Sequence, residues 1–161
     1  MSREISPGEA GSPPPWEPLE ILLVEDNPAD AELTVRALRE QGFANRIRLA
    51  RDGAEALEFL FGSGEESSLV SRPRLILLDL RLPKVDGLEV LERLRADPRT
   101  RHTPVVVLSS SGEDPDLEAA SNLGANAYVL KPVAFEAFME AVRSISVYWL
   151  LVNRVPDNLR S

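Results

Sequence analysis

The sequence predicts an α/β fold, a doubly wound parallel β-sheet with helices on both faces. Four short apolar runs are continuous rather than alternating in polarity, which is typical of strands covered on both faces. Longer amphipathic stretches separate these runs, so strands and helices alternate along the chain and right-handed crossovers are expected. The four runs are residues 21–24, 75–78, 105–108 and 127–130.

A helix and a further strand are expected after the first apolar run. Asn27 and Pro28 have the pattern of an N-cap with proline at the first helical position, and Gly42 marks the end of this helix. Residues 46–50 then alternate polar and apolar side chains. This alternation predicts a weaker strand at an edge of the sheet.

Acidic residues mark the starts of the next two helices. Asp52 is followed by Glu55, and Asp86 is followed by Glu89. Each pair has the spacing of an N-cap acid and a glutamate whose side chain reaches back to the cap. We therefore expect these helices to begin at Asp52 and at Asp86.

The last two helices have different signals. Asp114 and Pro115 predict the start of one helix, and Gly124 predicts its end. The final helix is expected from about Ala134, because apolar side chains then recur at helical spacing. Its apolar face consists of Phe135, Phe138, Met139, Val142 and Trp149.

Length and charge restrict the class of protein. The chain has 161 residues, which predicts one compact domain with tails. Its 18 Lys and Arg residues against 26 Asp and Glu residues give a net charge of -8. Nucleic-acid binding is therefore not expected, because it requires clustered cations. Cysteine is absent, which excludes disulfide bonds and thiolate chemistry.

The two ends of the chain differ from the middle. Residues 1–18 are rich in proline, and we interpret them as a flexible tail rather than a ligand for a proline-binding partner at residues 13–16. The domain is expected over residues 19–152, with a second tail over residues 153–161. The longest apolar run, residues 147–152, is far shorter than the roughly 20 residues that span a bilayer. We expect no membrane segment and no signal peptide, and a cytoplasmic location.

Charged and polar side chains follow the predicted strands. In a doubly wound sheet, ligands bind beyond the carboxyl ends of the strands. Glu25 and Asp26 follow the first strand, Asp79 follows the strand at residues 75–78, Ser109 follows the next, and Lys131 follows the last. Carboxylates about 4 Å apart repel each other by about 4 kcal/mol at an effective dielectric constant near 20, so the acidic group requires a cation. Oxygen ligands of this kind suit Mg2+.

Four segments at these strand ends resemble the signature sites of the receiver domains of two-component response regulators. The resemblance covers about residues 19–151 and implies a flavodoxin-like (βα)5 fold with a five-stranded sheet in the order 2-1-3-4-5. The segments are VEDN at residues 24–27, LDLRLP at residues 78–83 with Asp86 and Gly87, LSS at residues 108–110, and YVLKP at residues 128–132.

The resemblance implies that Asp79 accepts a phosphoryl group from a sensor histidine kinase. It also implies that Glu25 and Asp26 hold Mg2+ together with Asp79 and the main-chain carbonyl of Arg81. Such a chain assists its own phosphorylation and dephosphorylation but is not an enzyme in the usual sense. Phosphoryl transfer depends on positioning and positive charge, so these residue types suit the chemistry.

The resemblance assigns roles to two further residues that contact the phosphoryl group. Ser109 and Lys131 are expected to contact the phosphoryl oxygens. Ser109 is also expected to act as a switch with Tyr128, the aromatic residue that turns inward when the serine hydroxyl moves. The peptide bond between Lys131 and Pro132 is expected to be cis.

Three positions depart from the common pattern of the family. Arg81 and Ser111 stand two residues after Asp79 and Ser109, where neighbours tune the lifetime of the aspartyl phosphate. Val133 stands where phenylalanine is common. His102, the single histidine, is expected at the surface, so no donor histidine is expected within the chain.

The segment after Lys131 predicts the mode of output. It holds a helix and a tail but no DNA-binding or enzymatic domain, so we expect a stand-alone receiver that signals by protein contact. Its apolar part, residues 145–152, predicts an interface. Together with residues 131–133 and the loop at residues 62–72, residues 147–153 resemble the regulators of phytochrome-type sensor kinases, which implies a homodimer formed through the last helix.

Two other functions remain open at this stage. A phosphatase of the haloacid dehalogenase type also uses an aspartate nucleophile at a strand end with Mg2+, but its general acid stands where this chain has Arg81. A receiver that is never phosphorylated would act only as a binding adaptor, against which the intact acidic group and Lys131 argue.

Overall fold

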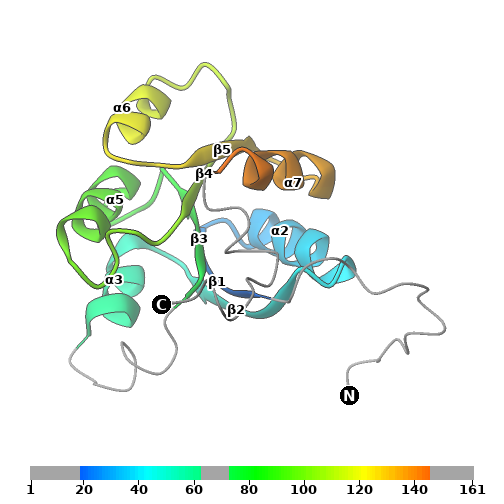
Figure 1. The fold of residues 1–161 in the computed structure, drawn as a ribbon, viewed down its shortest axis with the longest axis horizontal. Coiled ribbons are helices and arrows are strands. Elements are labelled where there is room, and N and C mark those ends of the chain that lie inside the picture. Colours follow the sequence, from blue (N-terminus) through cyan, green and yellow to red (C-terminus); the bar gives the residue numbers. More distant parts are fainter. Residues whose placement is uncertain (1–18, 63–72, 146–161) are drawn as a thin grey trace, which may run out of the picture.

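The computed structural model describes residues 19–62 and 73–145. Strands and helices alternate through these two ranges (Figure 1). The predicted tails and the apolar segment from residue 146, including Trp149, lie outside the described residues. The elements are β1 (Leu19–Val24), α2 (Pro28–Glu40), β2 (Ala44–Ala50), α3 (Gly53–Phe61), β3 (Leu75–Asp79), α5 (Gly87–Ala96), β4 (Val105–Ser109), α6 (Asp116–Asn122), β5 (Ala127–Leu130) and α7 (Phe135–Arg143).

The five strands form one parallel sheet in the order β2-β1-β3-β4-β5. This confirms the predicted doubly wound, flavodoxin-like fold with the strand order 2-1-3-4-5. Helices α2 and α7 cover one face of the sheet, and α3, α5 and α6 cover the other (Figure 1). The edge position predicted for residues 46–50 is also confirmed, although β2 begins two residues earlier.

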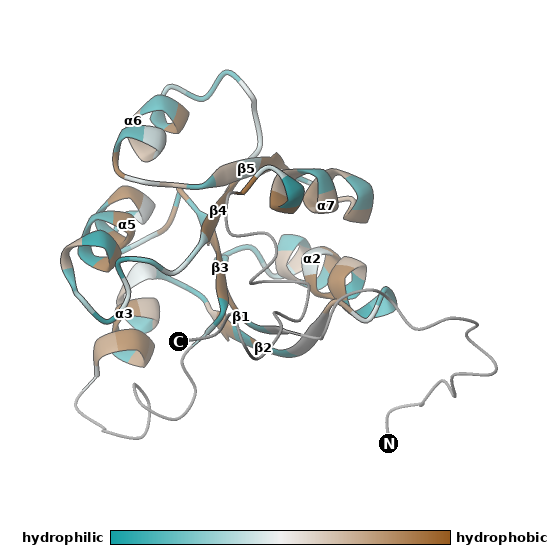
Figure 2. Ribbon diagram, in the orientation of Figure 1, coloured by the Kyte–Doolittle hydropathy of each residue, from teal (hydrophilic) through white to brown (hydrophobic). Residues whose placement is uncertain are grey.

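Two apolar layers hold the helices on the sheet. Beneath α2 and α7, Phe43 and Phe138 pack edge to face with ring centroids 5.0 Å apart. On the other face, Leu22 and Leu78 pack with Leu91 of α5. Every residue of β3 and β4 is buried, and both strands show apolar colours in Figure 2. The strands that carry the site are thus held firmly from both sides.

Strand β5 departs from the prediction that both of its faces are covered. Tyr128 is 51% exposed and Leu130 is 47% exposed, whereas Val129 is buried beneath α7. The physical reason is the position of β5 at the edge of the sheet. Helix α7 packs on one face of β5, while α6 lies mainly against β4, so the second face remains open.

The helix caps agree with the sequence at most positions. Asn27 caps α2, and Asp52 caps α3 by accepting a hydrogen bond from the Glu55 N–H at 2.7 Å. The Glu55 carboxylate reaches past this cap and accepts from the Arg51 N–H at 2.6 Å. Asp86 caps α5. No helix in the two described ranges is both long enough and apolar enough to cross a membrane.

The amino-terminal side of the sheet has a cationic anchor. The Arg95 guanidinium of α5 is partly buried and donates to the Gly124 carbonyl at 2.9 Å and to the Asn126 side chain at 3.0 Å. It also donates to the Thr103 carbonyl at 2.8 Å. One side chain therefore ties the end of α5 to the loop before β4 and to the turn after α6.

Candidate functional site

The backbone brings the residues after the central strands to one edge of the sheet. Asp79 is the last residue of β3 and lies beside Leu108 in the register with β4. The Glu25 N–H donates to a carbonyl of β2 at 2.9 Å, and the Lys131 N–H donates to the Ser109 carbonyl at 2.8 Å. Strand ends thereby fix Glu25, Asp79, Ser109 and Lys131 relative to one another.

Three carboxylates form a cluster at this edge. Glu25, Asp26 and Asp79 each offer an oxygen atom, and these atoms lie within 4.8 Å of one another. Glu25 and Asp79 are buried, while Asp26 is exposed and leaves one side open to solvent. Because the donors are all oxygen atoms and one side is open, the cluster fits Mg2+ or Mn2+. The ligand role predicted for the Arg81 carbonyl stays a prediction.

The Lys131 ammonium group lies among carboxylates. Its Nζ atom is 2.9 Å from Asp79 Oδ2, 3.2 Å from Glu25 Oε1 and 3.2 Å from Asp30 Oδ2. Burial lowers the pKa of Lys131, but the hydrogen bond and charge of Asp79 and the charge of Glu25 outweigh burial and raise this pKa overall. Lys131 is therefore a permanent cation that touches the carboxylate predicted to be the phosphoacceptor.

Glu25 has a raised pKa. Burial raises its pKa to about 7, and the hydrogen bond and negative charge of Asp79 act in the same direction. A hydrogen bond from the Asn27 N–H at 3.1 Å and the charge of Lys131 oppose this shift. The single positive charge of Lys131 thus does not neutralise the carboxylates of the cluster, as expected where a divalent cation is to bind.

Arg81 links the end of β3 to the loop before α6. Its N–H donates to Asp79 Oδ1 at 3.0 Å, and its guanidinium donates to the two Asp114 oxygens at 2.8 and 3.3 Å. The Asp114 side chain is only 8% exposed. The backbone N–H of Asp116, followed by Arg81, lowers the pKa of Asp114 below its usual value.

The Ser109 hydroxyl is engaged by its own loop. It donates to the Ser111 carbonyl at 2.7 Å and accepts from the Ser111 N–H at 3.2 Å. Ser109 is buried at the end of β4, one strand away from Asp79. To contact a phosphoryl oxygen through its proton, the hydroxyl must release the Ser111 carbonyl.

This arrangement of a buried strand-end aspartate, two neighbouring acids, a lysine and a serine matches a known family. Residues 21–143 match the model of the response regulator receiver domain. The chain belongs to this family. The peptide bond before Pro132 is cis, as the resemblance implied, and His102 is exposed, as predicted.

Among relatives of this receiver domain, a probable methanogenesis regulatory protein, FilR2 from Methanothrix harundinacea, is 48% identical over 87% of this chain and 89% of its own length. The solved bacteriophytochrome response regulator AtBRR is 48% identical, with a TM-score of 0.74 over 86% of this chain and 99% of that chain. The Mn(2+)-bound form of response regulator Rcp1 is 38% identical, with a TM-score of 0.67 over 86% of this chain and 99% of that chain. The curated Rcp1 protein is from Synechocystis. The receiver is therefore related to phytochrome response regulators.

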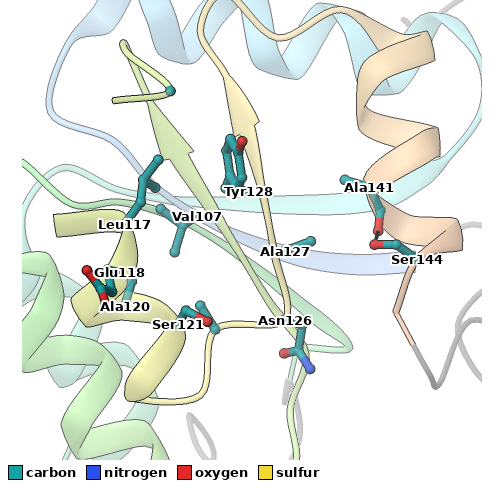
Figure 3. Close-up of a pocket in the computed structure, with 12 residues that line it drawn as sticks. Val107, Leu117, Glu118, Ala120, Ser121, Asn126, Ala127, Tyr128, Ala141 and Ser144 are labelled. Carbon is teal, nitrogen blue, oxygen red and sulfur yellow. Dashed lines mark hydrogen bonds between the residues drawn. The ribbon is translucent and has the colours of Figure 1, made fainter. Parts of the chain in front are cut away.

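Tyr128 of the receiver lies away from the acidic cluster, on the open face of β5. It lines a pocket of about 500 Å³ between α6, β5 and α7, together with Val107, Leu117 and Ala141 (Figure 3). Whether its ring turns inward with Ser109 stays a prediction.

Sequence reasoning missed two residues that shape the site, and the structure gives a packing reason for a third. Asp30 contacts Lys131, and its position three residues after the N-cap Asn27 was a usable signal. Asp114 was read only as the start of a helix, but it also pairs with Arg81. Gly87 begins α5 against the backbone of β3, where a Cβ atom would lie 2.6 Å from the Asp79 carbonyl oxygen. This close approach explains the glycine after Asp86.

Proposed function

We propose that this receiver accepts a phosphoryl group on Asp79 from a sensor histidine kinase and then signals by protein contact. One observation carries the proposal. The buried Asp79 carboxylate lies 2.9 Å from the Lys131 ammonium group and in the same cluster as the Glu25 and Asp26 oxygens. A nucleophile placed between a cation-binding cluster and a fixed ammonium group is what phosphoryl transfer requires.

In the proposed reaction, an Asp79 oxygen attacks phosphorus as the bond from phosphorus to the donor nitrogen breaks. Lys131 stabilises the charge that spreads over the phosphoryl oxygens, and Ser109 donates to one of them after releasing Ser111. Mg2+ held by Glu25, Asp26, Asp79 and the Arg81 carbonyl would supply further positive charge. The chain is thus a phosphoacceptor rather than a turnover enzyme.

The proposed partner is a cytoplasmic sensor kinase of the phytochrome type. The similarity to AtBRR and Rcp1 supports this choice. A homodimer formed through the last helix and its neighbours is also proposed, with no nucleic-acid partner. Because Ile145 is buried in the core, the dimer is best tested by sedimentation of the full chain beside a chain ending at Ile145. Equal numbers of subunits would contradict the dimer interface.

Acetyl phosphate tests the phosphoacceptor directly. With Mg2+, the wild type should gain one phosphoryl group by intact-mass measurement, and Asp79→Asn should gain none. Glu92→Gln removes an exposed acid from α5 and should label like the wild type. Labelling that survives Asp79→Asn would contradict the proposal, and absence of labelling in the wild type would favour a binding adaptor.

The phosphatase alternative receives no support from the site. The residue two positions after Asp79 is Arg81, whose guanidinium pairs with Asp114 and does not release a proton at neutral pH, so it cannot act as the general acid. We expect no turnover of a simple phosphate ester such as p-nitrophenyl phosphate. Turnover that Asp79→Asn abolishes would restore this alternative.

A further inference from the structure

The Lys131 ammonium group has three acidic partners. It donates hydrogen bonds to Asp79 and Glu25 and forms an ion pair with Asp30. An ammonium group has three N–H donors and accepts no hydrogen bond. Its partners are Asp79 at 2.9 Å, Glu25 at 3.2 Å and Asp30 at 3.2 Å. These three contacts come from β3, from the residue after β1, and from the first turn of α2. They hold Lys131 from three sides.

The three acidic partners differ in what else they do. Glu25 and Asp79 belong to the carboxylate cluster that fits a divalent cation, whereas Asp30 does not. Bound Mg2+ would compete with Lys131 for the negative charge of Glu25 and Asp79, and like charges repel, so it would also repel the ammonium group. Of the three acidic partners, Asp30 is then the one that interacts with Lys131 but does not belong to the cation-binding cluster.

Asp30 is held in place independently of Lys131. Its backbone N–H donates to the Asn27 side chain at 3.0 Å, in the capped first turn of α2. The amino end of a helix also favours a negative side chain. The backbone that carries the Asp30 carboxylate is therefore held by the helix cap and not by Lys131.

We infer that Asp30 is a positioning residue that holds the Lys131 ammonium group beside Asp79 when the carboxylate cluster binds Mg2+. This inference rests on the proposed function. Without Asp30, the ammonium group has only Glu25 and Asp79 as acidic partners, and it competes with Mg2+ for both. Loss of Asp30 should therefore weaken Mg2+ binding as well as slow phosphorylation.

The test measures Mg2+ affinity by calorimetry, with no phosphodonor present. Asp30→Asn should weaken binding by about fivefold, within the usual range for coupled neighbours. Glu32→Gln is the matched control, because it removes the same charge from α2 at an exposed residue that pairs with Arg36. It should leave Mg2+ affinity close to that of the wild type. Asp30→Glu, which keeps the charge, should restore most of the loss, and thermal unfolding checks that each variant is folded.

The same measurement in a Lys131→Met variant distinguishes positioning of Lys131 by Asp30 from direct attraction between the Asp30 charge and Mg2+. In Lys131→Met there is no ammonium group to displace, so adding Asp30→Asn should change Mg2+ affinity by less than about twofold. An equal loss in both backgrounds, or no loss in Asp30→Asn alone, would overturn the inference. If the wild type binds Mg2+ and is phosphorylated, and Asp30→Asn has the same Mg2+ affinity, only the role of Asp30 is refuted. A wild type that does not bind Mg2+ would refute the proposed function as well.

Discussion

Strands β3 and β5 both lead into the site, yet they are packed very differently. Every residue of β3 is buried, while alternate residues of β5 face solvent. Asp79 therefore stands at the end of a strand enclosed on both faces, whereas Lys131 follows a strand with one open face. The difference teaches that the fold separates two tasks. The proposed phosphoacceptor lies where the backbone is most enclosed, and the exposed surface beside Tyr128 lies where the sheet is least covered.

The sharpest test of this comparison replaces the same residue type in both strands. Leu77→Ala in fully buried β3 should lower the free energy of unfolding by about 2–5 kcal/mol, because it removes transfer energy and leaves a cavity. Leu130→Ala in β5 should cost about 1 kcal/mol or less, because that side chain is 47% exposed. Urea unfolding measures both. Similar losses would show that β5 is packed as firmly as β3.

Two glycines extend the comparison to the loops. Gly87→Ala would press a methyl group against the backbone of Asp79 and Leu80, and should cost about 1–3 kcal/mol and reduce phosphorylation of Asp79. Gly112→Ala is the control, since its Cβ atom would meet only the Leu130 side chain, at 3.9 Å. It should leave stability and labelling nearly unchanged. Thermal unfolding and intact-mass labelling of the two variants decide the matter, and equal behaviour would contradict the close approach at β3.

The smallest expected effect concerns the ion pair that joins the end of β3 to the loop before α6. Arg81→Met should lower the free energy of unfolding by about 1 kcal/mol or less, because the arginine side chain is 63% exposed. The pKa of Asp114 lies below its ordinary value in the folded state, so its stabilising effect is present above the ordinary aspartate pKa and is lost as pH falls through the folded-state pKa. Arg81→Met should raise this pKa toward its ordinary value, which carboxyl NMR titration measures. An unchanged pKa would mean that the hydrogen bonds from the Asp116 N–H and Ser109, and not Arg81, lower it.

Most of the fold followed from the sequence because continuous apolar runs and capping residues are local signals. The acids, serine and lysine of the site were found because strand ends in this topology meet at one edge. Asp30 and Asp114 were missed because their partners, Lys131 and Arg81, lie far away in the chain. The open face of β5 was missed for a related reason: its apolar run looks like that of β3, and only its place in the sheet decides which side chains are covered.

The Arg95 anchor has a mechanical consequence for α6. Its contact with the Gly124 carbonyl pins the turn that follows this helix, while the loop at the other end carries Asp114 and leads back to Ser109. A helix that is held at one end and displaced at the other rotates about the held end. A small shift of the Ser109 loop should therefore swing the amino end of α6 about Arg95 and reshape the pocket beside Tyr128.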